Sequence, residues 1–270
     1  MERITSRKNP RVLFWRSLKD RSVRETERCF IAEGGKLVTE ALGSAFPVEA
    51  VLIRDGEDIN GVLPPLPADI PVFLLSEDAF DSVCTFKTKQ SIAAAVRLEP
   101  HPASGAKLIA LDRVQDPGNV GTIIRTADAA GMDGVILSAD SADPFSPKTI
   151  RATMGSVFRL GLTVVRDLPD TLADLRRQGY SVICSALGGE PFYARQDIND
   201  RFVLVIGNEG SGVSEAVKAE ATHTLALPMP GGAESLNAAA AASIMMYDLA
   251  VRPRVISPGA PILKYKEEPI

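Results

Sequence analysis

Short apolar runs of strand length alternate with runs of helical periodicity between about residue 107 and residue 250. The apolar runs are Leu108–Leu111, Gly134–Leu137, Leu162–Val165, Tyr180–Cys184, Phe202–Ile206 and Thr224–Leu227. A strand that is apolar on both sides must be covered on both faces of its sheet, as happens in parallel sheets. The alternation therefore predicts an α/β fold, with a mostly parallel sheet and helices on both of its faces.

A stretch rich in proline and small residues, Glu99–Ala106, separates this region from a smaller one upstream. In the smaller region a strand, a glycine turn and a helix begin at Phe30, and Val48–Ile53, Val72–Leu75 and Ser91–Val96 have the composition of short strands. We therefore expect a small α/β domain over residues 1–98, a linker over 99–106, the main domain over 107–254 and a tail over 255–270.

The composition argues against several classes of protein. Three widely separated cysteines and only two histidines provide neither a disulfide framework nor a metal centre of the common kinds. No segment has the length and apolarity of a secretory signal or a membrane span. We expect a cytoplasmic protein that binds no metal ion and does not enter a membrane.

The charge is unevenly distributed along the chain. The net charge of −4 argues against indiscriminate binding of nucleic acid, yet residues 1–28 hold nine Lys or Arg and four Asp or Glu. Arg7, Lys8 and Arg11 belong to this basic segment. A basic arm binds phosphates by releasing counterions. A solvated amphipathic helix explains the same composition equally well, so both interpretations stay open.

Three segments combine glycines with polar side chains, each where an apolar run ends: Asp116–Arg125, Ile206–Gly212 and Leu227–Asn237. In an open α/β sheet, ligands bind at the carboxyl ends of the strands. Three such turns in order predict one ligand pocket, assembled from neighbouring strand ends.

Helical spacing in the first segment predicts which side chains are buried. The apolar stripe consists of Val120, Ile123, Ile124, Ala127 and Ala130. Arg125 projects almost opposite this stripe, at about 100° per residue, so it faces solvent, a ligand or a partner chain. Asn119 stands at the loop-to-helix junction, where Asn most often caps the helix.

The other two segments suit a nucleoside more than a phosphate. Gly207–Gly212 lacks the Walker A ending and the dinucleotide spacing of glycines, and Glu209 would repel a phosphate but suit a cation or a ribose hydroxyl. In the third segment, Ser235 and Asn237 precede five alanines, a run that lets another backbone approach closely. Helix capping is the alternative role for these two residues.

Together the three segments resemble the signature motifs of the SpoU/TrmH family of RNA ribose 2′-O-methyltransferases, within the SPOUT superfamily. Asp116-Pro-Gly-Asn-Val-Gly with Arg125, Gly207-Asn-Glu-Gly-Ser-Gly, and Leu227-Pro-Met with Ser235-Leu-Asn resemble motifs one to three in the family's order. Residues 30–97 resemble the ribosomal-protein-like substrate-binding domain that many members carry. Where relatives often have a Pro-Gln-Gly turn, this chain has Lys87–Ser91, so RNA contacts there are not carried over.

The resemblance implies a C-terminal trefoil knot, S-adenosylmethionine bound in the knot, and a homodimer with its active site at the interface. The positions that match cofactor contacts are Ala186, Gly207, Leu227, Met229 and Leu236. Arg125 matches the catalytic arginine, and the residues around it are Asn119, Glu209, Ser235 and Asn237. Because arginine is almost never neutral at pH 7, Arg125 either acts as the general base proposed for the family or holds a phosphate or the hydroxyl electrostatically.

We therefore expect an RNA 2′-O-ribose methyltransferase, acting on ribosomal RNA because of the added N-terminal domain; tRNA is the alternative target. Residues 1–98 would choose the RNA, and residues 107–250 would hold the cofactor. A non-catalytic ribosome-assembly factor of the same fold is a rival, since fold does not fix activity. A nucleotide-dependent metabolic enzyme fits the glycine turns but not the basic N-terminal segment.

Overall fold

The computed structural model describes residues 1–57, 63–86, 91–99, 101–196 and 198–252. The chain forms two compact units that interleave along the sequence. The first unit comprises Met1–Pro102, Asp116–Arg125 and Ala142–Leu160, and the second comprises Ala103–Gln115, Thr126–Ser141 and the residues from Gly161 onward. The tail expected over 255–270 lies outside the described residues.

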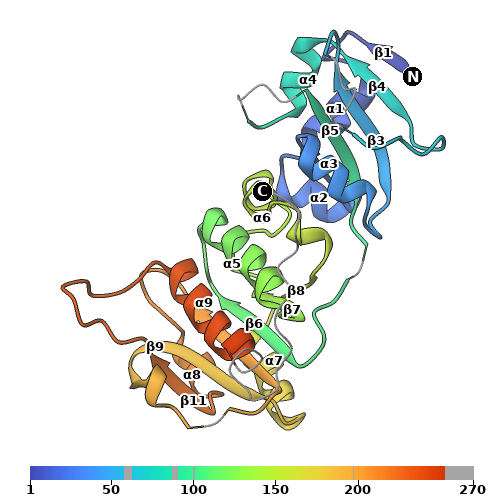
Figure 1. Ribbon diagram of the computed structural model, residues 1–270. Helices are drawn as coiled ribbons and strands as arrows, with labels where there is room; N and C mark the ends of the chain where they lie inside the picture. Colours follow the sequence, from blue (N-terminus) through green and yellow to red (C-terminus); the bar gives the residue numbers. More distant parts are fainter. Residues whose placement is uncertain (58–62, 87–90, 100, 197, 253–270) are drawn as a thin grey trace. The chain divides into compact units, whose positions relative to one another are not determined.

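The first unit is built on a five-stranded mixed sheet in the order β1-β4-β3-β5-β2 (Figure 1). Its strands are β1 (Glu2–Ile4), β2 (Cys29–Glu33), β3 (Val48–Arg54), β4 (Val72–Leu75) and β5 (Ile92–Arg97). β1, β4 and β3 run parallel, while β5 is antiparallel to both β3 and β2. The strands predicted in this region are confirmed to within one residue at each end.

The helices between the strands of this sheet are α1 (Pro10–Ser17), α2 (Arg21–Glu27), α3 (Gly35–Leu42) and α4 (Glu77–Val83). α1 and α4 bury Trp15 and Phe80 in one cluster with Phe73 of β4, and the rings of Trp15 and Phe73 lie 5.1 Å apart. The basic N-terminal segment is therefore folded into the domain as β1, α1 and α2, because its apolar residues at helical spacing cover the sheet. The segment is thus helical, as the amphipathic-helix interpretation expects, and the role of its basic side chains in phosphate binding stays a prediction.

The predicted RNA-binding side chains of this segment are exposed. Arg7, Lys8 and Arg11 all lie at the surface. Arg11 also pairs with Glu2 at 2.5 Å and lies 4.8 Å from the centroid of the Phe73 ring. Arg7 and Lys8 thus present their charge on a folded surface.

The second unit contains a six-stranded sheet in the order β11-β9-β10-β6-β7-β8, and every neighbouring pair is parallel (Figure 1). The strands are β6 (Lys107–Asp112), β7 (Gly134–Ser138), β8 (Gly161–Val165), β9 (Ser181–Pro191), β10 (Phe202–Gly207) and β11 (His223–Ala226). β7 and β10 are buried along their whole length, which requires cover on both faces. The predicted parallel sheet is confirmed, and β9 continues well beyond the predicted end at Cys184.

The remaining helices are divided between the two units. α7 (Leu168–Arg177) and α8 (Glu215–Lys218) share a buried apolar cluster with the central strands, and α9 (Ala238–Met246) contacts β10. α5 (Pro117–Ala130) supplies its first half to the first unit and its second half to the second unit. α6 (Pro147–Thr153) and the short η1 (Ser156–Phe158) belong to the first unit, and η2 (Phe192–Ala194) and the π-helical η3 (Tyr247–Val251) to the second. Within the described ranges, no helix has both the length and the apolarity needed to span a membrane.

Candidate functional site

A pocket of about 380 Å³ opens in the second unit, beside the middle of β9 and at the ends of β10 and β11. The five residues predicted to contact a cofactor all line it: Ala186, Gly207, Leu227, Met229 and Leu236. Glu209 and Ser235 line it as well. The second and third glycine-rich segments are therefore brought together at one pocket, as the sequence predicts. No residue of the first segment, Asp116–Arg125, is among the described lining residues, so the predicted pocket of three segments is met only in part.

Gly207 occupies a position where no side chain fits. A Cβ atom built there would lie 2.2 Å from the carbonyl carbon of Gly212 and 2.2 Å from the nitrogen of Val213. Asn208 and Gly212 exchange backbone hydrogen bonds of 3.1 and 2.9 Å, so the loop folds back on itself at this point. A glycine is required because the returning backbone passes directly against the end of β10.

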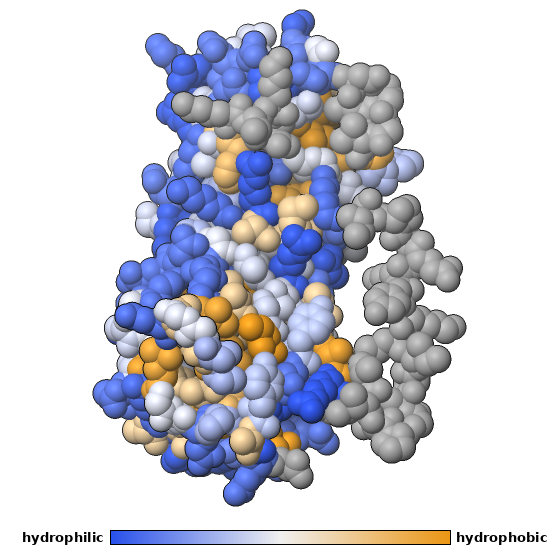
Figure 2. Space-filling model, turned by 60° about the vertical axis from the view of Figure 1, so that its left-hand side comes forward, coloured by the Kyte–Doolittle hydropathy of each residue, from blue (hydrophilic) through white to orange (hydrophobic). Residues whose placement is uncertain are grey.

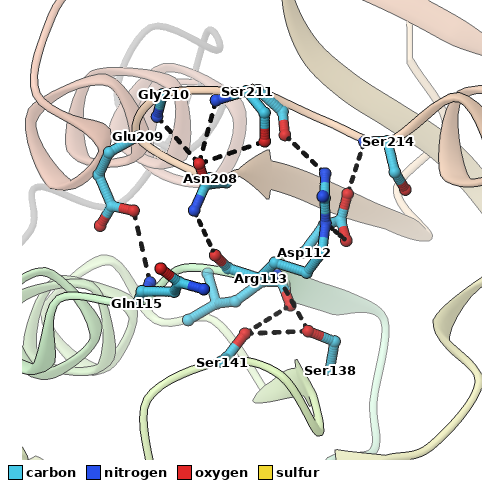
Figure 3. A network of polar contacts seen from close by, with 12 residues as sticks. Asp112, Arg113, Gln115, Ser138, Ser141, Asn208, Glu209, Gly210, Ser211 and Ser214 are labelled. Carbon is cyan, nitrogen blue, oxygen red and sulfur yellow. Dashed lines mark hydrogen bonds and ion pairs between the residues drawn. The ribbon is translucent and has the colours of Figure 1, made fainter.

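Asn208 fixes the shape of this loop and ties it to the segment after β6 (Figure 3). Its side-chain oxygen accepts hydrogen bonds from the backbone nitrogens of Gly210 and Ser211, each at 3.0 Å. Its side-chain nitrogen donates to the carbonyl oxygen of Arg113 at 2.9 Å. Because Arg113 has a left-handed backbone, with φ of 58°, this bond holds a turn that an L-residue rarely adopts.

Asp112 makes the second connection between the same two segments (Figure 3). The buried carboxylate accepts a hydrogen bond of 2.6 Å from the backbone nitrogen of Ser214 and pairs with the guanidinium of Arg113 at 3.2 Å. The carboxylate of Glu209 accepts a bond of 3.4 Å from the backbone nitrogen of Gln115. Sequence reasoning missed Asp112 and Asn208; their signal was a polar side chain at the end of an otherwise apolar strand.

The charge of the pocket discriminates between ligands. Glu209 and Glu234 line it, whereas no lysine or arginine is found among its described lining residues. A dinucleotide would place its pyrophosphate beside these carboxylates without a compensating cation, which is unfavourable. S-adenosylmethionine has a net positive charge, because its sulfonium and ammonium groups outweigh its single carboxylate, and its adenine suits the apolar Leu227 and Leu236. The carboxylates and the apolar walls of the pocket therefore fit S-adenosylmethionine.

Asn237 and Ser235 have different local roles. Asn237 is the N-cap of α9, because its side-chain oxygen accepts hydrogen bonds from the nitrogens of Ala239 at 2.9 Å and Ala240 at 3.3 Å. The capping alternative is thus confirmed for Asn237. Ser235 lies in the segment 230–237, whose residues are all exposed, and faces the pocket.

Arg125 and Asn119 belong to the first unit, on the first half of α5. The predicted apolar stripe of this helix is buried, and Arg125 is exposed as predicted. Arg125 forms no ion pair with the residues that the structure describes. Asn119 is buried, and the cap of the helix is Asp116, whose carboxylate accepts a bond of 2.8 Å from the backbone nitrogen of Asn119.

The thiols are poor candidates for nucleophilic chemistry. Burial raises the pKa of Cys29 and the pKa of Cys184 to about 12, and nearby Glu49 and Asp112 respectively add to the shift. Burial also raises the pKa of Cys84, with a further contribution from Glu33. Since the thiolate is the reactive form, all three stay inert near neutral pH.

Two family models match the chain. The model of the SpoU rRNA Methylase family matches residues 106–247, and that of the MRM3-like substrate binding domain matches residues 9–94. A Bacillus subtilis protein, 23S rRNA (guanosine(2553)-2′-O)-methyltransferase RlmP, is 40% identical over 250 residues, covering 92% of this chain and 99% of that protein.

Solved structures agree with these matches. An AdoMet-bound rRNA methyltransferase from Sinorhizobium meliloti is 33% identical, with a TM-score of 0.81 and coverage of 95% of this chain and 99% of its own. The SpoU methyltransferase AviRb from Streptomyces viridochromogenes, in complex with AdoMet, is 27% identical, with a TM-score of 0.82 and coverage of 93% and 100%. The chain therefore belongs to the SpoU rRNA methylase family and is an S-adenosylmethionine-dependent RNA 2′-O-ribose methyltransferase.

Proposed function

We propose that this methyltransferase acts on ribosomal RNA in the cytoplasm, with residues 1–98 choosing the RNA and residues 107–254 holding the cofactor. The name of the Bacillus subtilis relative, which matches over nearly its full length, supports a ribosomal substrate. The match to a substrate-binding domain over residues 9–94 supports the division of labour. The observation that carries the ribosomal substrate is the 40% identity to that relative over 92% of this chain, and the pocket with all five predicted cofactor contacts supports cofactor binding by residues 107–254.

The bound cofactor supplies an electrophilic methyl group on its sulfonium. In-line transfer to a ribose oxygen needs the two groups to be aligned and the hydroxyl proton to be removed. Leu227, Met229 and Leu236 would hold the nucleoside, and the acidic pocket would attract the cationic end. Arg125 would hold the phosphate or orient the hydroxyl, and Asn119, Glu209 and Ser235 would surround the ribose. Asn237 would support this site by capping α9.

Arg7, Lys8 and Arg11 are proposed to contact RNA phosphates. Replacing Arg7 and Lys8 together by alanine should flatten the slope of log affinity against log salt by about one unit for each lost contact. Fluorescence anisotropy with ribosomal RNA from cells lacking the protein would measure this slope. Arg177→Ala, an exposed change on α7, is the control. An unchanged slope in the double variant would remove these side chains from the RNA interface.

The proposal includes a homodimer that forms through α9, the helix after Asn237. Each subunit would contain a C-terminal trefoil knot. The fold similarity to SpoU methyltransferases supports the knot. On the face that Figure 2 shows, apolar side chains gather at the surface. Leu236, Ile244 and Tyr247 are exposed by 39%, 39% and 46%, and the whole segment 230–237 is exposed in the single chain. A second copy of the chain would cover these apolar side chains and the segment 230–237.

Ile244→Asp should convert the dimer into a monomer, because a buried unpaired charge opposes association. Light scattering at micromolar concentration would measure the mass. Val164→Asp is the matched control, since Val164 is 45% exposed on β8 of the same unit. An active wild-type monomer, or dissociation by both substitutions alike, would contradict the proposed interface.

A further inference from the structure

α5 and α6 are in backbone contact at Gly121. A Cβ atom built on Gly121 would lie 2.4 Å from the Cβ of Ala152 and 2.6 Å from the carbonyl oxygen of Thr149, both on α6. Neither neighbour is the flexible end of a side chain, so a larger residue would force the two helices apart. Arg125 follows four residues later, one turn further along the same side of α5. The spacing of the two helices therefore fixes where Arg125 lies within the first unit.

α6 is in turn fastened to the N-terminal domain by a buried ion pair. The guanidinium of Arg24 donates to the carboxylate of Asp143, from Nε at 3.1 Å and from Nη2 at 2.5 Å, and the two side chains are only 4% and 14% exposed. Arg24 also donates to the carbonyl oxygens of Leu18 and Lys19, at 2.7 Å each. Arg24 therefore neutralises the charge of Asp143, and its bonds to Leu18 and Lys19 hold Arg24 in place.

Asp143 also organises the turn that leads into α6. Its side chain accepts a bond of 2.8 Å from the backbone nitrogen of Phe145, and its carbonyl oxygen accepts one of 2.8 Å from the hydroxyl of Thr149. Thr149 is the residue whose own carbonyl oxygen faces Gly121. A continuous path of contacts therefore runs from Arg24 through Asp143 and Thr149 to α5.

An aromatic cluster makes the attachment rigid. The ring of Phe30, in β2, lies 5.5 Å from that of Phe145 and 6.0 Å from that of Phe158, and Phe46 packs edge-on against Phe158 at 5.6 Å. Phe30 and Phe158 are buried. Residues 142–160 are consequently held to the N-terminal sheet by an apolar contact as well as a charged one.

We propose that Gly121 and Asp143 are positioning residues, through which the substrate-binding domain sets the orientation of Arg125. This inference rests on the proposed role of Arg125 in methyl transfer. The compact unit that contains the RNA-binding domain also contains Arg125, whereas every lining residue of the cofactor pocket belongs to the other unit. Loss of either positioning residue should therefore slow the transfer step without weakening the binding of cofactor or RNA.

The test is Gly121→Ala in the full-length protein, with Gly43→Ala as the matched control. A Cβ at Gly43 meets nothing nearer than 3.6 Å, and this glycine also lies in the first unit. A displacement of about 1 Å can cost about a hundredfold in rate, so we expect a loss of that order in the single-turnover rate at saturating cofactor and ribosomal RNA. The affinities for S-adenosylhomocysteine and for RNA should stay unchanged, and Gly43→Ala should behave like the wild type.

Asp143→Asn is the second variant and serves if Gly121→Ala does not fold. It keeps an acceptor for Phe145 but removes the charge that pairs with Arg24, and we expect a smaller loss of rate with both affinities retained. Gly121→Ala in an Arg125→Lys background should have less than its full effect, because the two changes disturb one group. If Gly121 had a purely structural role, the losses of transfer rate caused by the two substitutions would be additive in free energy.

The outcomes separate this inference from the proposed function. Full transfer rates in Gly121→Ala and Asp143→Asn, or rates that fall only in step with either affinity, would overturn the positioning role. If Arg125→Ala is inactive in the same assay while both variants are fully active, the inference fails and the proposed role of Arg125 stands. Full activity of Arg125→Ala would instead refute that role.

Discussion

Arg125→Ala should lower the rate of methyl transfer by at least about a hundredfold while leaving the affinity for S-adenosylhomocysteine unchanged. Arg125 is exposed on a helix whose apolar stripe is buried, so its removal should not disturb packing. The cofactor pocket contains no residue of α5 among its described lining residues, so binding should persist. Single-turnover transfer from labelled S-adenosylmethionine and calorimetric titration would measure the two quantities.

Arg177→Ala is the control for this variant, since Arg177 is an exposed arginine that pairs with its helical neighbour Asp174. Arg125→Lys then distinguishes the two chemical roles. A lysine keeps the positive charge and should retain part of the activity if Arg125 acts electrostatically on a phosphate or hydroxyl. If Arg125 is the general base, lysine should move the pH dependence of the rate. An unfolded Arg125→Ala, or one with wild-type activity, would refute the assignment.

Gly207→Ala should markedly weaken binding of the cofactor. The added methyl group would fall 2.2 Å from backbone atoms of both Gly212 and Val213, so the loop that lines the pocket must open. Opening it would also strain the bonds that Asn208 makes to Gly210 and Ser211. We expect the affinity for S-adenosylhomocysteine to fall by at least about tenfold, which is about 1.4 kcal/mol.

Gly210→Ala is the matched control, because it places the same methyl group in the same loop. Its nearest contact would be the side-chain oxygen of Asn208 at 3.6 Å, an ordinary van der Waals distance. This variant should bind S-adenosylhomocysteine like the wild type. Equal affinities for the Gly207 and Gly210 variants would show that the close approach at Gly207 does not shape the pocket.

Local patterns in the sequence predicted the elements that carry the site. Strands such as Phe202–Gly207 are apolar throughout because both faces of the sheet are covered, and this signal is visible without any long-range information. The exposure of Arg125 followed from helical spacing alone. The residues that line the pocket were found through the family resemblance, since no local periodicity brings Ala186 and Leu236 together.

The interleaving of the two units could not be predicted in the same way. Residues 142–160 join the N-terminal sheet through Phe145 and Phe158, which contact Phe30 more than a hundred positions away in the chain. Nothing in the local sequence of Asp143 indicates that its partner is Arg24. A cut at Ala106 would therefore strip these side chains of their partners, so point substitutions are the better test of the division of labour.

Ribose methylation of ribosomal RNA, mapped in cells with and without the protein, tests the central claim most directly. Loss of the protein should remove one 2′-O-methyl group from ribosomal RNA, and the wild-type gene should restore it while the Arg125→Ala gene should not. Purified protein with S-adenosylmethionine should methylate the same nucleotide in RNA from the deficient cells. An unchanged ribosomal methylation map, with the missing methyl group found in tRNA or in no RNA, would contradict the proposed substrate.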